Sequence, residues 1–99
     1  AVLRTGVAVA VPAGCVGLVC DRSSLAKRGL KTAGGVIDAG YRGEVGVVVW
    51  NLSRETQAVP QSARIAQMLV IPIATPAPVE TPDLGETLRG AAGFGSTGK

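Results

Sequence analysis

The chain has 99 residues, about one domain, and a formal net charge of +3. No apolar run approaches the ~18 residues that a membrane-spanning helix needs, so the sequence excludes such a helix. The arginines are dispersed and only 3% of the residues are aromatic, which argues against direct nucleic-acid binding. The chain has no His and two Cys, so we expect no protein-held metal centre. Cys15 and Cys20 are predicted to be free, buried thiols.

Short apolar runs separated by Gly and Pro predict strands and turns in the first third of the chain. Residues 7–11 form an apolar run that ends at the turn signal of residues 12–14, and residues 16–20 read as the next strand. Residues 23–29 offer a hydroxyl N-cap, good helix formers and a Gly stop. They predict one or two helical turns.

The middle of the chain predicts a tight hairpin followed by the clearest strand. Residues 34–37 begin the hairpin, and Gly40 marks a bend on its far side. In the strand of residues 44–51, three valines at odd positions share one face, and Trp50 lies on the other. Because both faces are largely apolar, we expect this strand to be covered on both sides, with a neighbouring subunit as a candidate cover.

The remaining elements complete an all-β barrel or sandwich. Residues 56–59 and 64–73 supply the last predicted strands, which gives a β body over residues 1–73. Four prolines, Pro72, Pro76, Pro78 and Pro82, prevent regular strand pairing and favour an extended arm over residues 74–88. Residues 89–99 are rich in glycine and predict a flexible C-terminal tail.

Residues 35–44 carry the most informative polar pattern. A hairpin could present main-chain N–H and C=O groups to the edge of a planar base. Asp38 could activate a water there, and the ring of Tyr41 could support a sugar. The alternative interpretation is a turn with a capping Asp and a half-buried Tyr.

Three other segments could bind phosphate or a base, and each has a plainer interpretation. Residues 21–26 offer a guanidinium, two hydroxyls and helix-start N–H groups, which suit phosphate oxygens but also fit an ordinary Ser-capped turn. Residues 64–67 have polar ends that could simply lie at a barrel rim. In the tail, Arg89 and Phe94 could meet phosphate and base, or belong to a disordered terminus.

Taken together and in order, these segments resemble four of the five motifs of the deoxyuridine triphosphatase (dUTPase) family. They are R-S-[GS]-L-A at residues 22–26, G-x-I-D-x-x-Y-R-G-E at 35–44, R-I-A-Q at 64–67 and R-G-x-x-G-F-G-S-T-G at 89–98. The resemblance implies a jelly-roll-like β barrel in a homotrimer whose active sites are shared between subunits. It also implies hydrolysis of dUTP to dUMP and pyrophosphate, which supplies dTMP synthesis and keeps uracil out of DNA.

The resemblance assigns a role to each matching residue. Asp38 would deprotonate the water that attacks the α-phosphorus, and Tyr41 would pack under deoxyribose and leave no room for a 2′-hydroxyl. The backbone of Gly35, Val36 and Ile37 would bind uracil. The remaining substrate contacts would come from Arg22, Ser23, Ser24, Gln67, Arg89, Gly95 and Ser96 around the triphosphate, with Phe94 stacking on uracil. Magnesium would be held by the triphosphate and waters.

The chain departs from the family pattern at four places. The first motif, A-G-x-D-L, would lie upstream of Val2, so we expect weak hydrolysis by these residues alone. Asp21 replaces the usual Pro before Arg22, which puts a negative charge beside the phosphate ligands. Residues 62–63 and Ala92 also differ, without removing a proposed catalytic group.

Two other functions stay open on the sequence. A dCTP deaminase of the same fold would have a Glu three residues before an Asn like Asn51, but Val48 stands there and argues against deamination. A catalytically silent trimerisation or nucleotide-binding module is the other alternative. We expect a cytoplasmic protein, or a nuclear or organellar one in a eukaryote.

Overall fold

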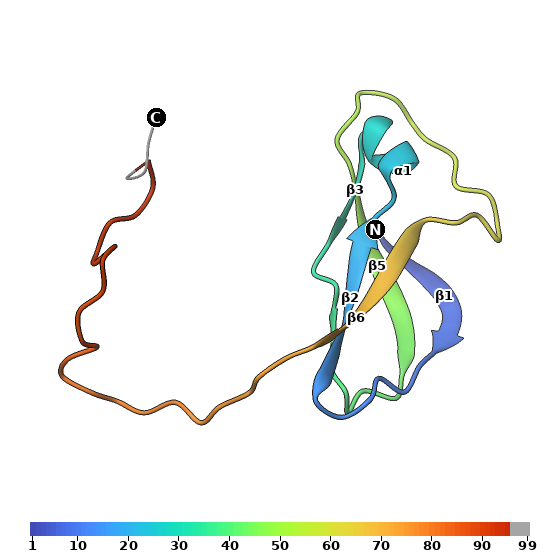
Figure 1. Ribbon diagram of the computed structural model, residues 1–99. Coiled ribbons are helices and arrows are strands. Elements are labelled where there is room, and N and C mark those ends of the chain that lie inside the picture. Colours follow the sequence, from blue (N-terminus) through green and yellow to red (C-terminus); the bar gives the residue numbers. More distant parts are fainter. Residues whose placement is uncertain (96–99) are drawn as a thin grey trace.

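A computed structural model describes residues 1–95 and shows a small β body from which the last part of the chain leads away (Figure 1). The elements follow in the order β1 (Val2–Ala8), β2 (Cys15–Asp21), α1 (Ser23–Lys27), β3 (Leu30–Ala33), β4 (Val36–Ile37), β5 (Glu44–Asn51) and β6 (Ala66–Pro72). The all-β prediction is confirmed. Within the described residues, no helix is long and apolar enough to cross a membrane.

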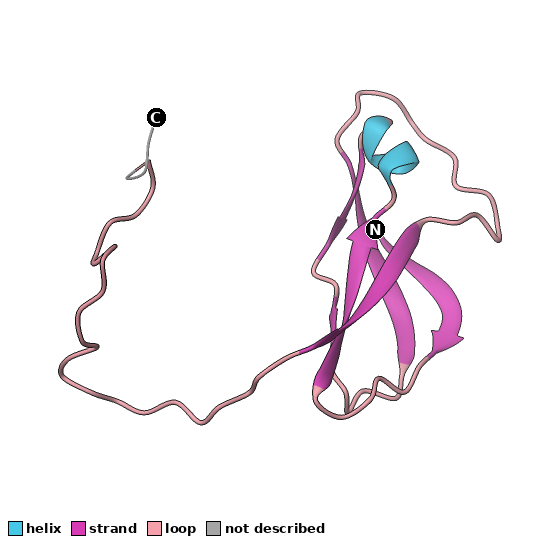
Figure 2. Ribbon diagram, viewed as in Figure 1, coloured by secondary structure: helices cyan, strands magenta, loops and turns pink. Residues whose placement is uncertain are grey.

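The strands form two three-stranded antiparallel sheets, which lie against each other (Figure 2). Their orders are β1-β5-β3 and β4-β2-β6. Strands β2 and β6 pair along their whole length, from Cys15 opposite Pro72 to Asp21 opposite Ala66. This arrangement agrees with a jelly-roll-like barrel, and it makes β3 and β4 edge strands of different sheets.

The core is small and aliphatic, with Val11, Leu30, Val45 and Val47 buried. Val45 and Val47 lie on the face of β5 that was predicted to carry the odd-numbered valines, and the third of these, Val49, is half-buried. On the opposite face, however, Trp50 is 61% exposed, so the chain by itself does not cover both faces of this strand. Cover by a second subunit stays a prediction.

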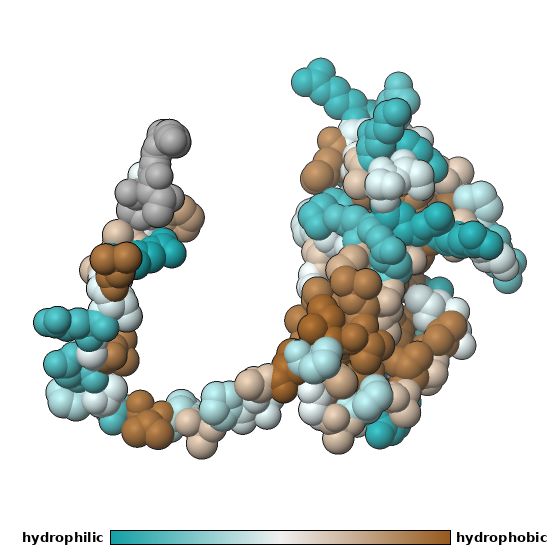
Figure 3. Space-filling model, in the orientation of Figure 1, coloured by the Kyte–Doolittle hydropathy of each residue, from teal (hydrophilic) through white to brown (hydrophobic). Residues whose placement is uncertain are grey.

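Figure 3 shows apolar side chains gathered on the surface over β2 and β6. Leu69, Val70 and Ile71 of β6 are among the exposed large hydrophobic residues there. The two cysteines of β2 are free, as predicted, but they are partly exposed rather than buried.

Several predicted boundaries are wrong. The first strand covers Val2–Ala8 instead of residues 7–11, because the main chain pairs with β5 from Val2 onwards, whatever the polarity of the side chains. No strand forms at residues 56–59, where polar contacts take over: the Gln57 amide donates to the main-chain oxygen of Arg28 and to the hydroxyl of Ser53. Strand β3 was not predicted, since four residues of mixed polarity give little periodicity.

Three further details also differ from the predictions. Arg22, not a serine, is the N-cap of α1, and its side chain makes no capping hydrogen bond. Pro72 lies inside β6, at its last position, where a missing N–H costs little. The expected hairpin at residues 34–44 is a turn between sheets, because β4 pairs with β2 while β5 pairs with β1 and β3.

Residues 74–88 contain no helix or strand and lead away from the body (Figure 1). The described part of the tail has local polar contacts: the Nε of Arg89 donates to the main-chain oxygen of Ala92 at 2.6 Å. Phe94 is fully exposed.

Candidate nucleotide site

One cavity of about 250 Å³ lies between the end of β4 and the start of β5. The five residues predicted to hold the base, the sugar and the water all line it: Gly35, Val36, Ile37, Asp38 and Tyr41. Glu44, Gly46 and Val48 form part of its β5 side. The structure therefore brings together the nucleoside half of the predicted site.

Gly35 fixes the backbone that enters this cavity. Its φ is +93°, and its carbonyl accepts a 2.7 Å hydrogen bond from the N–H of Val19. A Cβ at this position would lie 2.8 Å from the carbonyl oxygen of Val19, so only glycine fits. Because Gly35 bonds to Val19 and Ile37 lies opposite Gly17, the main-chain N–H and C=O of Val36 point away from β2, to the free edge of the described sheet, where they are available to a base.

Tyr41 lies in the turn after β4, and both its main chain and its side chain make hydrogen bonds there. Its N–H donates to the carbonyl of Asp38 at 3.0 Å, and its hydroxyl donates to the main-chain oxygen of Glu44 at 2.7 Å. The ring crosses over Gly43, where an added Cβ would lie 2.5 Å from the phenolic oxygen. The side chain is 44% exposed, so the ring is fixed yet remains accessible to a ligand.

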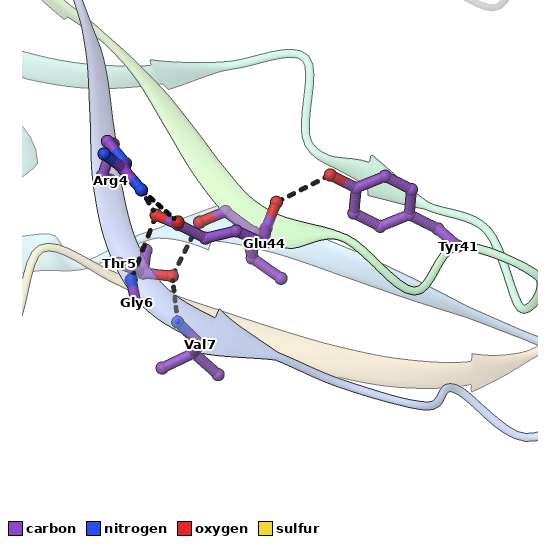
Figure 4. Close-up of polar contacts among 7 residues, drawn as sticks. Arg4, Thr5, Gly6, Val7, Tyr41 and Glu44 are labelled. Atoms are coloured by element: carbon purple, nitrogen blue, oxygen red, sulfur yellow. Dashed lines mark hydrogen bonds and ion pairs between the residues drawn. The ribbon is translucent and has the colours of Figure 1, made fainter.

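The carboxylate of Glu44 joins this turn to β1 (Figure 4). It accepts hydrogen bonds from Arg4 Nη2 at 3.0 Å, Arg4 Nε at 3.3 Å and the N–H of Gly6 at 3.2 Å. The register of β1 on β5 is irregular here, and Thr5 Oγ1 also donates to the carbonyl of Val45 at 2.6 Å. Side chains thus supply bonds that the strand ladder lacks. The guanidinium of Arg4 and then the N–H of Gly6 lower the pKa of Glu44 below its ordinary 4.5.

The predicted phosphate ligands of residues 22–24 and 67 gather at the other end of β2. Arg22 and Gln67 line a cavity of about 510 Å³ whose walls are otherwise mostly apolar. Arg22 Nη1 donates to the carbonyl of Arg64 at 2.9 Å. Ser23 and Ser24 are exposed in α1, directly after Arg22.

The charge expected from Asp21 is paired. Its carboxylate accepts 2.7 Å hydrogen bonds from Lys31 Nζ, from the N–H of Thr32 and from the hydroxyl of Thr32. The ammonium of Lys31 and then the N–H and hydroxyl of Thr32 lower the pKa of Asp21 from 3.8 to about 2. The carboxylate is therefore a stable anion with a cation beside it, which reduces the repulsion expected near the phosphate ligands.

The two halves of the site lie at different levels of β2. Gly35 bonds to Val19 and Ile37 pairs with Gly17, three and five positions before Arg22, which corresponds to about 10 and 17 Å of strand. Arg89, Phe94 and Gly95 lie on the segment that leads away from the body (Figure 1), and Ser96 lies outside the described residues. In the described part of the chain, the nucleoside residues and the phosphate residues Arg22 and Gln67 line separate cavities.

Sequence reasoning missed the residues that support the cavity. Glu44 closes the motif of residues 35–44, but nothing in the motif indicates its partners. Arg4 lies 40 positions away, and its pairing with Glu44 follows only from the strand register. Gly43 carried a signal, because a glycine between two polar residues often marks a close approach.

Known proteins resemble the whole chain. The family model described as dUTPase matches residues 1–98. The deoxyuridine 5′-triphosphate nucleotidohydrolase of Mus musculus is 46% identical over 100 residues, which cover 100% of this chain and 62% of that protein. The protein of the same name from Arabidopsis thaliana is 46% identical over 99 residues, covering 99% of this chain and 60% of that protein.

Two solved structures have the same fold. The dUTPase of Staphylococcus bacteriophage 80alpha, solved with dUPNHPP, superimposes with a TM-score of 0.87 and 30% identity, covering 100% of this chain and 76% of that chain. The native EIAV dUTPase gives a TM-score of 0.72 and 29% identity, covering 85% of this chain and 72% of that chain. The chain spans about 60% of the length of the mouse and Arabidopsis relatives. On the family match and these identities, the chain belongs to the dUTPase family.

Proposed function

We propose that this chain hydrolyses dUTP to dUMP and pyrophosphate. The observation that carries the proposal is the cavity in which Asp38 and Tyr41 lie beside the exposed edge of β4. The main chain of residues 35–37 would pair with the edge of uracil, and the ring of Tyr41 would pack under the deoxyribose. Asp38 would take a proton from the water that attacks the α-phosphorus, and the pyrophosphate would leave.

The phosphate ligands would come from a second copy of the chain in a homotrimer. The separate cavities support this, because Arg22 and Gln67 do not line the cavity that holds Asp38 and Tyr41. The exposed Trp50 and the apolar residues of β6 also leave surfaces for subunit contact. The arm over residues 74–88 would carry the tail to another subunit.

The tail would close over the bound nucleotide. Arg89, Gly95 and Ser96 would contact the triphosphate, and the fully exposed ring of Phe94 would stack on uracil. A closing segment of this kind shields the reacting phosphate from bulk water.

Magnesium would bind through the triphosphate and waters, and it would neutralise charge that develops on the phosphate oxygens. Asp21, the carboxylate next to the phosphate ligands, already accepts three hydrogen bonds in the folded chain. A mutant dUTPase from phage phi11 coordinates a structural Mg(II) ion in its solved structure.

For location we propose the cytoplasm, with an organelle as the alternative, since a human relative is named mitochondrial.

The test is a pyrophosphate-release assay on the native protein with dUTP, dCTP, dTTP and UTP. We expect turnover of dUTP in preference to the other three nucleotides, because a wrong base leaves buried polar groups unpaired. Comparable turnover of dCTP or UTP would contradict the assignment of the cavity. Tight binding of a non-hydrolysable dUTP analogue without turnover of dUTP would favour a silent nucleotide-binding module.

A further inference from the structure

Asp21 connects the two sheets. It is the last residue of β2, in the sheet β4-β2-β6, whereas its partners Lys31 and Thr32 belong to β3 of the other sheet. One carboxylate oxygen accepts from both the N–H and the hydroxyl of Thr32, and the other accepts from Lys31 Nζ, each at 2.7 Å. Both oxygens are therefore used in holding β3.

The bond to the N–H of Thr32 explains why a carboxylate suits this position. Among residues 1–95, strand β3 pairs with β5 alone, so one of its edges carries no strand partner there. Main-chain groups on such an edge need another acceptor or water. Asp21 supplies that acceptor from the opposite sheet, which the Pro of the family pattern has no side chain to do.

The same residue contacts the phosphate ligands through its main chain. Its carbonyl accepts a 2.7 Å hydrogen bond from Nε2 of Gln67. The next residue is Arg22, whose guanidinium bonds to the carbonyl of Arg64 beside β6. The orientations of Arg22 and Gln67 thus depend on where the end of β2 lies.

We propose that Asp21 is a positioning residue for the phosphate half of the site. By fixing the end of β2 against β3, it holds the guanidinium of Arg22 and the amide of Gln67 in place for phosphate oxygens. Lys31 compensates its charge, so an anion can bind nearby. This inference rests on the proposed function, but it concerns anion binding and can be measured without turnover.

The experiment compares Asp21→Ala and Asp21→Asn with the native protein, by calorimetric titration with pyrophosphate and with deoxyuridine, in magnesium. Glu55→Gln is the control, because it removes the same charge from an exposed side chain. Residues that share one hydrogen-bond network affect one another's contribution to binding. We therefore expect Asp21→Ala to weaken pyrophosphate binding and to raise the KM for dUTP by roughly 2- to 30-fold.

A general loss of structure would give a different result. Deoxyuridine carries no phosphate, so its affinity should be unchanged in Asp21→Ala if the residue positions phosphate ligands. Asp21→Asn keeps an acceptor for Thr32 and should lose less affinity than Asp21→Ala. Lys31→Ala leaves the carboxylate uncompensated, so it should weaken pyrophosphate binding in the native background and have little further effect in Asp21→Asn.

Native affinity for pyrophosphate in Asp21→Ala would overturn the inference, and so would an equal loss for deoxyuridine and pyrophosphate. Failure of the native protein to hydrolyse dUTP would contradict the proposed function instead. The pyrophosphate titrations would still decide the role of Asp21 in that case.

Discussion

The hydroxyl of Tyr41 donates a 2.7 Å hydrogen bond to the main-chain oxygen of Glu44, whose carboxylate accepts three hydrogen bonds from Arg4 and Gly6. The ring proposed to hold the sugar is thus connected, through one residue, to an irregular pairing between β1 and β5. The position of the ring depends on this strand contact as well as on its own turn. A substitution that displaces the ring should therefore reduce the selectivity for deoxyribose over ribose at a smaller change than the one needed to unfold the chain.

Gly43→Ala tests this dependence. The new Cβ would lie 2.5 Å from the phenolic oxygen of Tyr41, so the ring must move. A misplaced substrate-holding group can cost up to about 100-fold in rate. We expect kcat/KM for dUTP to fall by roughly 10- to 100-fold and the preference for dUTP over UTP to narrow. Gly40→Ala is the matched control, because nothing lies within 4 Å of its added Cβ. Similar kinetics in the two variants would show that the ring is not held as described.

Gly35→Ala should cost stability. The residue has a φ of +93°, and its Cβ would meet the carbonyl of Val19 at 2.8 Å. Strained backbone of this kind costs about 1–3 kcal/mol. We expect the free energy of unfolding, measured by chemical denaturation, to fall by about that amount, with Gly40→Ala close to native. An unchanged midpoint in Gly35→Ala would mean that β4 shifts without cost and does not define the cavity.

The sequence predicted that the residues of 35–41 would lie together, because they are contiguous. Asp38 and Tyr41 lie three positions apart on one turn, so local spacing is enough to place them in one cavity, while their roles stay predictions. The strand Glu44–Asn51 was predicted with its bounds, since its valines follow the period of two.

Contacts between distant segments could not be predicted in this way. The pairing of Asp21 with Thr32 depends on two short strands of different sheets meeting at one edge, and β3 gives little periodic signal. The irregular register of β1 likewise has no marker in the sequence beyond Gly6. The separation of the two site halves needs the full strand order, which periodicity does not supply.

Acid should weaken the contact between the sheets in a defined pH range. The pKa of Asp21 is lowered from 3.8 to about 2 in the folded chain, so the unfolded chain takes up a proton first. The stabilisation from Asp21 is therefore fully present above about pH 4 and is lost as the pH falls towards 2. We expect native protein and Asp21→Asn to differ in denaturation midpoint at pH 5 and to converge near pH 2. If the difference in denaturation midpoint stayed the same from pH 5 to pH 2, the result would contradict the ion pair between Asp21 and Lys31.

Trp50 reports on assembly because the chain has one Trp. Its side chain is 61% exposed in the single chain and lies on the face of β5 that the chain leaves uncovered. If subunits cover this face, dilution below the dissociation constant should shift its fluorescence to longer wavelength. Sedimentation at the same concentrations should show the loss of the trimer. An emission maximum that is unchanged while the trimer dissociates would place the subunit contact elsewhere.

Asp38→Asn is the most direct test of the chemistry. The substitution keeps the shape of the side chain in the cavity but removes the group proposed to accept the proton of the attacking water. General-base catalysis is worth about 10²–10⁴-fold, so turnover of dUTP should fall by that factor. Binding of a non-hydrolysable dUTP analogue should change much less, because the proposed base and sugar contacts come from the backbone of residues 35–37 and from Tyr41. Asp83→Asn makes the same substitution in the arm, outside the proposed catalytic and binding residues, and should leave turnover near native.

Near-native turnover in Asp38→Asn would show that another group activates the water. An equal loss of turnover and analogue binding would make Asp38 a binding residue, because a base that acts only on the water contributes to the transition state and not to the ground-state complex.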